Sequence, residues 1–127
     1  ANINVIVDDL VNPSPPMGFA LEERGALFSR SKPDLVLALA LIHHLVLTRS
    51  VPMEMLIGWM RGLCPKWVFE FAHEGDPMVE FLIKAKLGRT HPYSRGEFEA
   101  ALSKSFRVLE RLELGGADRT LYLAEGI

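Results

Sequence analysis

Several classes of protein are excluded by what this sequence lacks. Cys64 is the single cysteine among 127 residues, so the chain cannot form an internal disulfide, which fits a reducing compartment. The longest apolar run, residues 35–42, is far shorter than the ~20 residues that a membrane-spanning helix needs. No basic segment followed by a long apolar stretch opens the chain, so no signal peptide is predicted. We therefore expect a cytoplasmic protein that does not enter a membrane.

The charge is also unremarkable. Fourteen basic and sixteen acidic residues are scattered along the chain and leave a net charge of -2, with no basic run. Nothing in this balance favours nucleic acid or an acidic membrane surface as a partner. The length predicts a single domain, residues 1–127, with a real core and no internal repeat. The chain begins with Ala1 rather than Met, which suggests a processed or excised piece.

Residues 34–45, Asp-Leu-Val-Leu-Ala-Leu-Ala-Leu-Ile-His-His-Leu, form the most informative stretch. A run that is apolar at every position, without alternation, predicts a strand buried on both faces, as in a parallel sheet covered by helices. Ligands of such sheets collect at the carboxyl ends of the strands. We therefore expect His43 and His44, the first polar groups after the run, at the rim of a site.

Strands and helices alternate through most of the chain. Strands are predicted over residues 3–7, 34–40, 66–72, 106–112 and 119–124, and helices over residues 21–30, 53–63 and 76–85 and after the capping box of residues 94–97. The alternating part predicts a parallel sheet with right-handed helical crossovers. Too few residues separate the last two strands for a crossover, so these two strands should be antiparallel.

These patterns resemble a known family. The run Asp-Leu-Val-Asn-Pro-Ser-Pro of residues 9–15, the segment that ends in His43-His44-Leu45, and Glu70-Phe71 are similar to class I S-adenosylmethionine-dependent methyltransferases, and in particular to a bacterial subgroup with nodulation-related members. The resemblance extends over residues 4–122 and covers the third to the seventh strand of the family fold. It implies an α/β protein with a partial Rossmann-like sheet that ends in an antiparallel hairpin and lacks the family's first two strands.

The resemblance also implies site residues. Asp9 would accept a hydrogen bond from the adenine amino group of S-adenosylmethionine, and the backbone amide of Leu10 would contact the same ring. Ala38, Leu39 and Ala40 would lie along the methionine part of the cofactor. His43 and His44 match a histidine pair that is frequent at this point in the family, and the resemblance places His43 in the cofactor site. His43 and Glu70 would lie nearest the methyl acceptor as catalytic candidates.

The glycine-rich strand-to-helix turn that holds the cofactor in this family is missing. The implied residues therefore supply half of a pocket. We expect a methyltransferase in the intact protein, with an acceptor that the sequence does not identify, and an inactive chain here. The rival interpretation is a non-enzymatic interaction module built on the same half of the fold.

Each candidate residue also has a plainer interpretation. Asp9 could end a strand and solvate a turn. His43 has a side chain suited to proton transfer near neutral pH, but a packed, hydrogen-bonded structural histidine is the commoner case. Asp76 is explained by helix capping as well as by a role at the rim. A hydrolase built on His43 and Asp76 would lack a nucleophile elbow.

A metal site is not expected. Adjacent histidines at the end of a strand point in different directions, so His43 and His44 would not ligate one ion together. The other two histidines, His73 and His91, have no recognisable ligand spacing.

Without the family's first two strands, residues 35–40 would have one bare edge, and a flat apolar edge is a template for further pairing. Either residues 3–7 move in beside this strand, or a second copy of the chain covers it. We expect the second outcome, a homodimer with a continuous sheet or an exchanged strand.

Overall fold

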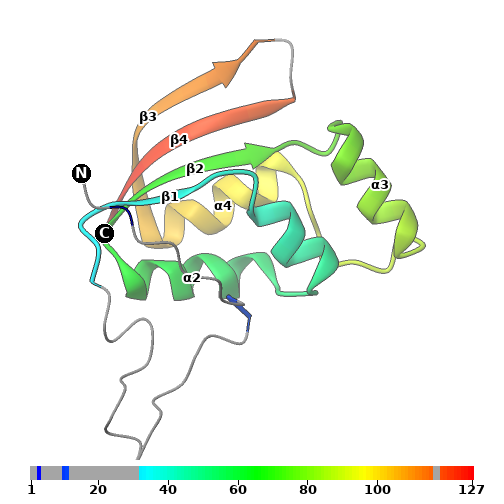
Figure 1. The fold of residues 1–127 in the computed structure, drawn as a ribbon, viewed down its shortest axis with the longest axis horizontal. Coiled ribbons are helices and arrows are strands. Elements are labelled where there is room, and N and C mark those ends of the chain that lie inside the picture. Colours follow the sequence, from blue (N-terminus) through cyan, green and yellow to red (C-terminus); the bar gives the residue numbers. More distant parts are fainter. Residues whose placement is uncertain (1–2, 4–9, 12–31, 116–117) are drawn as a thin grey trace, which may run out of the picture. The chain divides into compact units, whose positions relative to one another are not determined.

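The computed structural model describes residues 3, 10–11, 32–115 and 118–127 (Figure 1). The chain divides into two units, Ala1–Lys32 and Pro33–Ile127, and each is described by itself. The strand predicted over residues 3–7, the helix predicted over residues 21–30 and Asp9 lie outside the described residues. All the elements below belong to the second unit.

The second unit follows the predicted order of strands and helices closely. Its elements, with the labels of Figure 1, are β1 (Val36–Ala38), the π-helix η2 (His44–Thr48), α2 (Met53–Leu63), β2 (Lys66–Ala72), α3 (Pro77–Ala85), α4 (Arg95–Ser105), β3 (Phe106–Leu114) and β4 (Arg119–Gly126). The predicted bounds are confirmed for α2, β2 and α3. The hairpin strands are longer than predicted, whereas β1 has only three residues.

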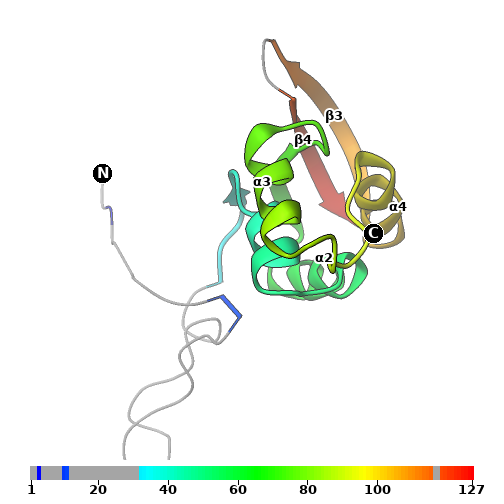
Figure 2. The same ribbon diagram turned by 90° about the vertical axis from the view of Figure 1, so that its right-hand side faces the viewer.

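The four strands form one open, mixed sheet in the order β1-β2-β4-β3. β1 and β2 are parallel, as predicted, and Leu37 lies opposite Val68. β4 lies between β2 and β3 and is antiparallel to both, so the predicted antiparallel hairpin is confirmed. The β3–β4 hairpin projects beyond the helices (Figure 2).

Two side-chain caps fix where α3 and α4 begin. Asp76 accepts hydrogen bonds from the backbone amides of Met78 and Val79, at 2.9 and 3.4 Å, directly before the first-turn residue Pro77. The Ser94 hydroxyl oxygen accepts one from the amide of Glu97 at 3.1 Å. Both starts were predicted, because these cues are local in the sequence.

The core lies between the sheet and the pair α2 and α4, which run along one face of it (Figure 1). Aromatic rings dominate the contact. Phe98 of α4 stacks on Phe71 of β2, with ring centroids 4.4 Å apart, and meets Tyr122 of β4 edge-on at 5.1 Å. All three side chains are fully buried. Large buried rings of this kind contribute much of the apolar area that stabilises the unit.

One expectation for the segment 34–40 is wrong. It was predicted to be buried on both faces, but only Ala38 is, with 1% of its surface exposed. Leu35, Leu37 and Leu39 are 46%, 59% and 55% exposed. The reason is that, in the described part of the chain, helices cover only the opposite face of the sheet. The strand also ends early, because the backbone turns at Ala40.

None of the described helices is long and apolar enough to cross a bilayer.

Candidate functional site

Four polar side chains gather where β1 and β2 end. We call this group the rim cluster: His43, Glu70, Asp76 and Arg119. His43 follows β1, Glu70 lies in β2, Asp76 precedes α3, and Arg119 opens β4. The sheet register brings Arg119 close to Glu70, because Arg119 lies opposite Ala72 at the end of β2. His43 and Glu70, which were predicted to lie at one rim, thus lie at the same end of the parallel strands, and their role there stays a prediction.

Arg119 joins the two carboxylates of the rim cluster. Its Nε donates to Oδ2 of Asp76 at 3.1 Å, and its Nη1 donates to Oε1 of Glu70 at 2.9 Å. The Arg119 and Glu70 side chains are 24% and 20% exposed, so these ion pairs are partly shielded from water. Two carboxylates and one guanidinium leave the triplet with a net negative charge. Glu70 was predicted to end its strand, but it lies two residues before the last residue of β2.

Asp76 serves two structural purposes at once. One carboxylate oxygen caps α3, and the other binds Arg119. Burial alone would raise the pKa of this carboxyl, but the Arg119 hydrogen bond and the capping amides outweigh burial and hold the pKa below its usual value. The predicted capping role of Asp76 is confirmed.

His43 is almost completely buried, with 1% of its surface exposed. Its ring lies against the ring of His44, with centroids 4.2 Å apart. Burial first, and then His44 and Arg119, lower the pKa of His43 to about 4, against the opposing effect of Asp76 and Glu70. At neutral pH the imidazole is therefore uncharged. The ring atom Nδ1 has no hydrogen-bond partner among the described residues.

This environment favours a packing role for His43 over proton transfer. A general base works best when its pKa lies near the working pH, and a pKa of about 4 makes a weak base at neutral pH.

The cofactor segment implied by the resemblance, Ala38 to Ala40, turns sharply at the carboxyl end of β1. Ala40 has a φ of 53°, in the left-handed region that a residue with a Cβ rarely adopts. Strained backbone of this kind is found preferentially at functional sites. Leu10 is half-buried and lies in a turn of the first unit.

Tyr93 lies in the segment before α4 and contacts the end of β2. Its hydroxyl donates a hydrogen bond to the carbonyl oxygen of Ala72, at the end of β2. Its ring stacks on Phe71 with centroids 5.1 Å apart. Burial, and then the nearby Asp76 and Glu74, raise the pKa of the phenol. Tyr93 therefore ties the α4 approach to the sheet.

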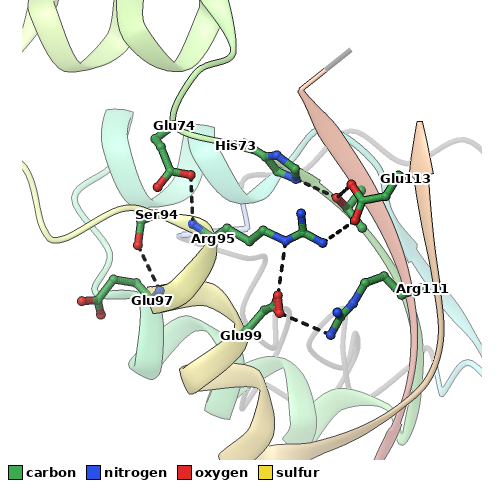
Figure 3. A network of polar contacts seen from close by, with 9 residues as sticks. His73, Glu74, Ser94, Arg95, Glu97, Glu99, Arg111 and Glu113 are labelled. Atoms are coloured by element: carbon green, nitrogen blue, oxygen red, sulfur yellow. Dashed lines mark hydrogen bonds and ion pairs between the residues drawn. The ribbon is translucent and has the colours of Figure 1, made fainter. Parts of the chain in front are cut away.

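A second polar network lies on the helix-covered face, between α4 and the hairpin (Figure 3). His73 Nε2 is 2.7 Å from the hydroxyl of Thr120, which donates to Glu113 at 2.9 Å. Arg95 binds both Glu113 and Glu99. The charges are thus paired with one another across α4, β3 and β4. We interpret this network as a brace that holds α4 to the hairpin.

No group of three or more histidine, cysteine, aspartate or glutamate side chains within the described ranges is arranged to hold a metal ion.

Arg119 was not predicted from the sequence as a site residue, because its partner Glu70 is 49 residues away and only the sheet register brings the two together.

The fold and the rim cluster define an α/β protein with an open, four-stranded mixed sheet and a charged rim beside its parallel strands. The chain is related to the nodulation protein NoeA of Rhizobium meliloti (strain 1021): the two are 35% identical over 117 residues, or 92% of this chain. The matched region is 25% of that protein, so the chain spans about a quarter of its relative's length. No protein-family model matches the chain.

Proposed function

We propose that this chain is the C-terminal part of a class I S-adenosylmethionine-dependent methyltransferase. In the intact protein, this part would line the methionine side of the cofactor site and face the methyl acceptor. The chain alone would be inactive, because the glycine-rich cofactor loop of the family is missing from its sequence.

The observation that carries the proposal is the order of the strands. In the family the sheet runs 3-2-1-4-5-7-6, and its last strand is inserted antiparallel between two earlier ones. The described strands, taken in chain order, lie as β1-β2-β4-β3, with β4 antiparallel to both neighbours. This order is what the family's fourth to seventh strands would give, and strands in simple sequential order would not produce it.

The residues present fit the cofactor in part. Leu39 is exposed and Ala40 half-buried at the turn that ends β1, where a ligand could lie, whereas Ala38 is buried. By contrast, both carboxylates of the rim cluster are engaged by Arg119, so neither stands ready to bind ribose hydroxyls. In the proposed enzyme the described residues would therefore supply one wall of the cofactor pocket.

When bound, S-adenosylmethionine supplies a methyl group on a positively charged sulfur. The part that this chain plays is positioning, which accounts for much of the rate in reactions that join two held reactants. The negative rim triplet would favour the approach of the cationic cofactor. His43 would support the rim as a neutral, packed side chain, and Glu70 would shape the acceptor side while bound to Arg119.

The test is calorimetric titration of S-adenosylhomocysteine into the related R. meliloti protein and into this chain. We expect saturable binding to the longer protein and at most weak binding to this chain alone, because the family's glycine-rich cofactor loop is missing from its sequence. In the longer protein, the substitution equivalent to Leu39→Glu should weaken binding at least about tenfold, because it puts a bulky charged side chain into the segment that would lie along the methionine part of the ligand.

The matched control is Leu109→Glu, since Leu109 is similarly exposed (45%) but lies on β3. No binding to the longer protein at high ligand concentration, or equal losses in both variants, would contradict the proposal.

The second candidate is a non-enzymatic interaction module. The observation that favours it is the bare apolar face of the sheet around Leu37. If S-adenosylhomocysteine binds neither protein while the chain self-associates, this candidate replaces the first.

A further inference from the structure

One face of the sheet has no covering element in the described part of the chain. The register places apolar side chains from all four strands on this face, opposite to the face that packs on α2 and α4. We call it the open face. Its larger apolar residues are Leu35, Leu37, Leu39, Val68, Leu112, Leu114, Leu121 and Leu123.

The open face combines a broad sheet surface with an apolar centre. Four strands spaced about 4.8 Å apart and on average about seven residues long give the whole face, charged ends included, roughly 400 Å². Contiguous exposed apolar surface with a polar rim marks interaction sites. The face is also hollowed: Val68, Leu121 and Leu123, with Leu112 and Glu110 on β3, line a depression of about 230 Å³.

The parallel pairing of β1 with β2 adds to this argument. Strands of parallel sheets are normally buried on both faces, whereas antiparallel sheets tolerate one wet face. Leu37, at the centre of β1, is nevertheless 59% exposed. β1 also ends the sheet formed by the described strands, so both an edge and a face are open at the same place.

The charges at the two ends of the open face are complementary to each other. At one end lie Lys66 and the ion pair of Arg107 with Glu125, which together carry one net positive charge. At the other end lies the rim triplet of Glu70, Asp76 and Arg119, with one net negative charge. The centre between these ends is apolar on β1, β2 and β4 and carries Glu110 on the outer strand β3.

A surface with opposite charges at its two ends matches an inverted copy of itself. We propose that a second copy of this chain covers the open face, with the two sheets packed face to face about a two-fold axis that runs across the strands. The axis brings the Lys66 end of each copy over the Glu70 end of the other, twice. Leu37 and its neighbours then form a shared apolar layer about 10 Å thick. Glu110, on the outer strand β3, stays at the wet margin.

The proposal concerns this chain by itself: a second copy over the open face would cover Leu39 and the rim triplet, so this dimer and a cofactor at the carboxyl end of β1 would exclude each other. It differs from edge-to-edge pairing of β1, which would extend the sheet but leave the open face exposed. A covering segment from the longer polypeptide is the competing occupant, and in that case the isolated chain has no reason to dimerise through this face.

The test is sedimentation velocity of the purified chain over a wide concentration range. We expect a reversible dimer. Leu37→Asp should weaken dimerisation at least about 100-fold, because symmetry buries the new charge twice. The matched control is Leu87→Asp, since Leu87 is 79% exposed, lies after α3 outside the open face, and has a φ of 55° that aspartate tolerates. The control should dimerise like the wild type.

A milder pair of variants keeps the test valid if Leu37→Asp fails to fold. Lys66→Glu should weaken the dimer about tenfold by placing like charges over one another, whereas Lys104→Glu on the helix-covered side should not. A chain that stays monomeric at every concentration would overturn the proposal. So would a dimer that is equally stable in the Lys66 and Lys104 variants.

Discussion

The buried imidazole of His43 should make the stability of the fold depend on pH in a defined window. Its pKa is lowered from 6.5 to about 4 in the folded chain, and unfolding returns the ring to water. Between these two pKa values the imidazole is protonated in the unfolded state but not in the folded state. The free energy of unfolding therefore falls as the pH falls from 6.5 towards 4. Above pH 6.5 both states are neutral, and this contribution is fully present.

The size of the effect follows from the difference in pKa. A difference of about 2.5 between 6.5 and about 4, at 1.36 kcal/mol for each pKa unit, corresponds to up to about 3 kcal/mol. The variant His43→Leu keeps an apolar side chain of similar size in the site and removes the titration. Its free energy of unfolding should therefore lose up to about 3 kcal/mol less than that of the wild type between pH 7 and pH 4.

The assay is urea unfolding followed by circular dichroism at a series of pH values. The other three histidines and the carboxylates are common to both proteins, so the difference between the two curves isolates His43. If wild type and His43→Leu lose stability in parallel between pH 6.5 and pH 4, then the imidazole is not desolvated and the reasoning is refuted.

Three further changes test the fold and the rim. Asp76→Ala should lower the free energy of unfolding by about 2 kcal/mol, since it removes the α3 cap and a partner of Arg119. Asp76→Asn keeps a capping oxygen and should recover about half of this loss in chemical denaturation. Equal losses in the two variants would show that the cap is unimportant. Ala40→Gly should raise the melting temperature slightly, because glycine relieves about 1 kcal/mol of strain at φ 53°, and the larger conformational entropy of glycine in the unfolded chain offsets part of this gain. A clear fall in the melting temperature would contradict the left-handed conformation of Ala40. Phe98→Ala should cost about 3–5 kcal/mol in urea unfolding, because the ring is fully buried against Phe71; a loss under 1 kcal/mol would show that the core is elsewhere.

The elements that could be predicted from the sequence are those with local cues. α3 begins at Pro77 after the cap Asp76, and Ser94 opens α4, so no long-range information was needed. The antiparallel hairpin followed from the short connection between its strands. β3 and β4 were underestimated at their ends, where pairing with a neighbouring strand rather than propensity decides how far a strand extends.

The features that escaped prediction depend on parts of the chain far apart in sequence. Arg119 meets Glu70 only through the sheet register. The apolar run around Leu37 indicated burial, but a pattern of side chains does not state whether the covering element belongs to the same chain. The lowered pKa of His43 likewise arises from burial and from neighbours that only the folded unit brings together.

The most direct measurement of the central proposal is hydrogen exchange of the related R. meliloti protein with and without S-adenosylhomocysteine. The account predicts slower amide exchange in the segment that matches residues 38–40, at the carboxyl end of β1, because the ligand would lie along that turn. Slowed exchange elsewhere with none in this segment, or no change anywhere at high ligand concentration, would contradict it.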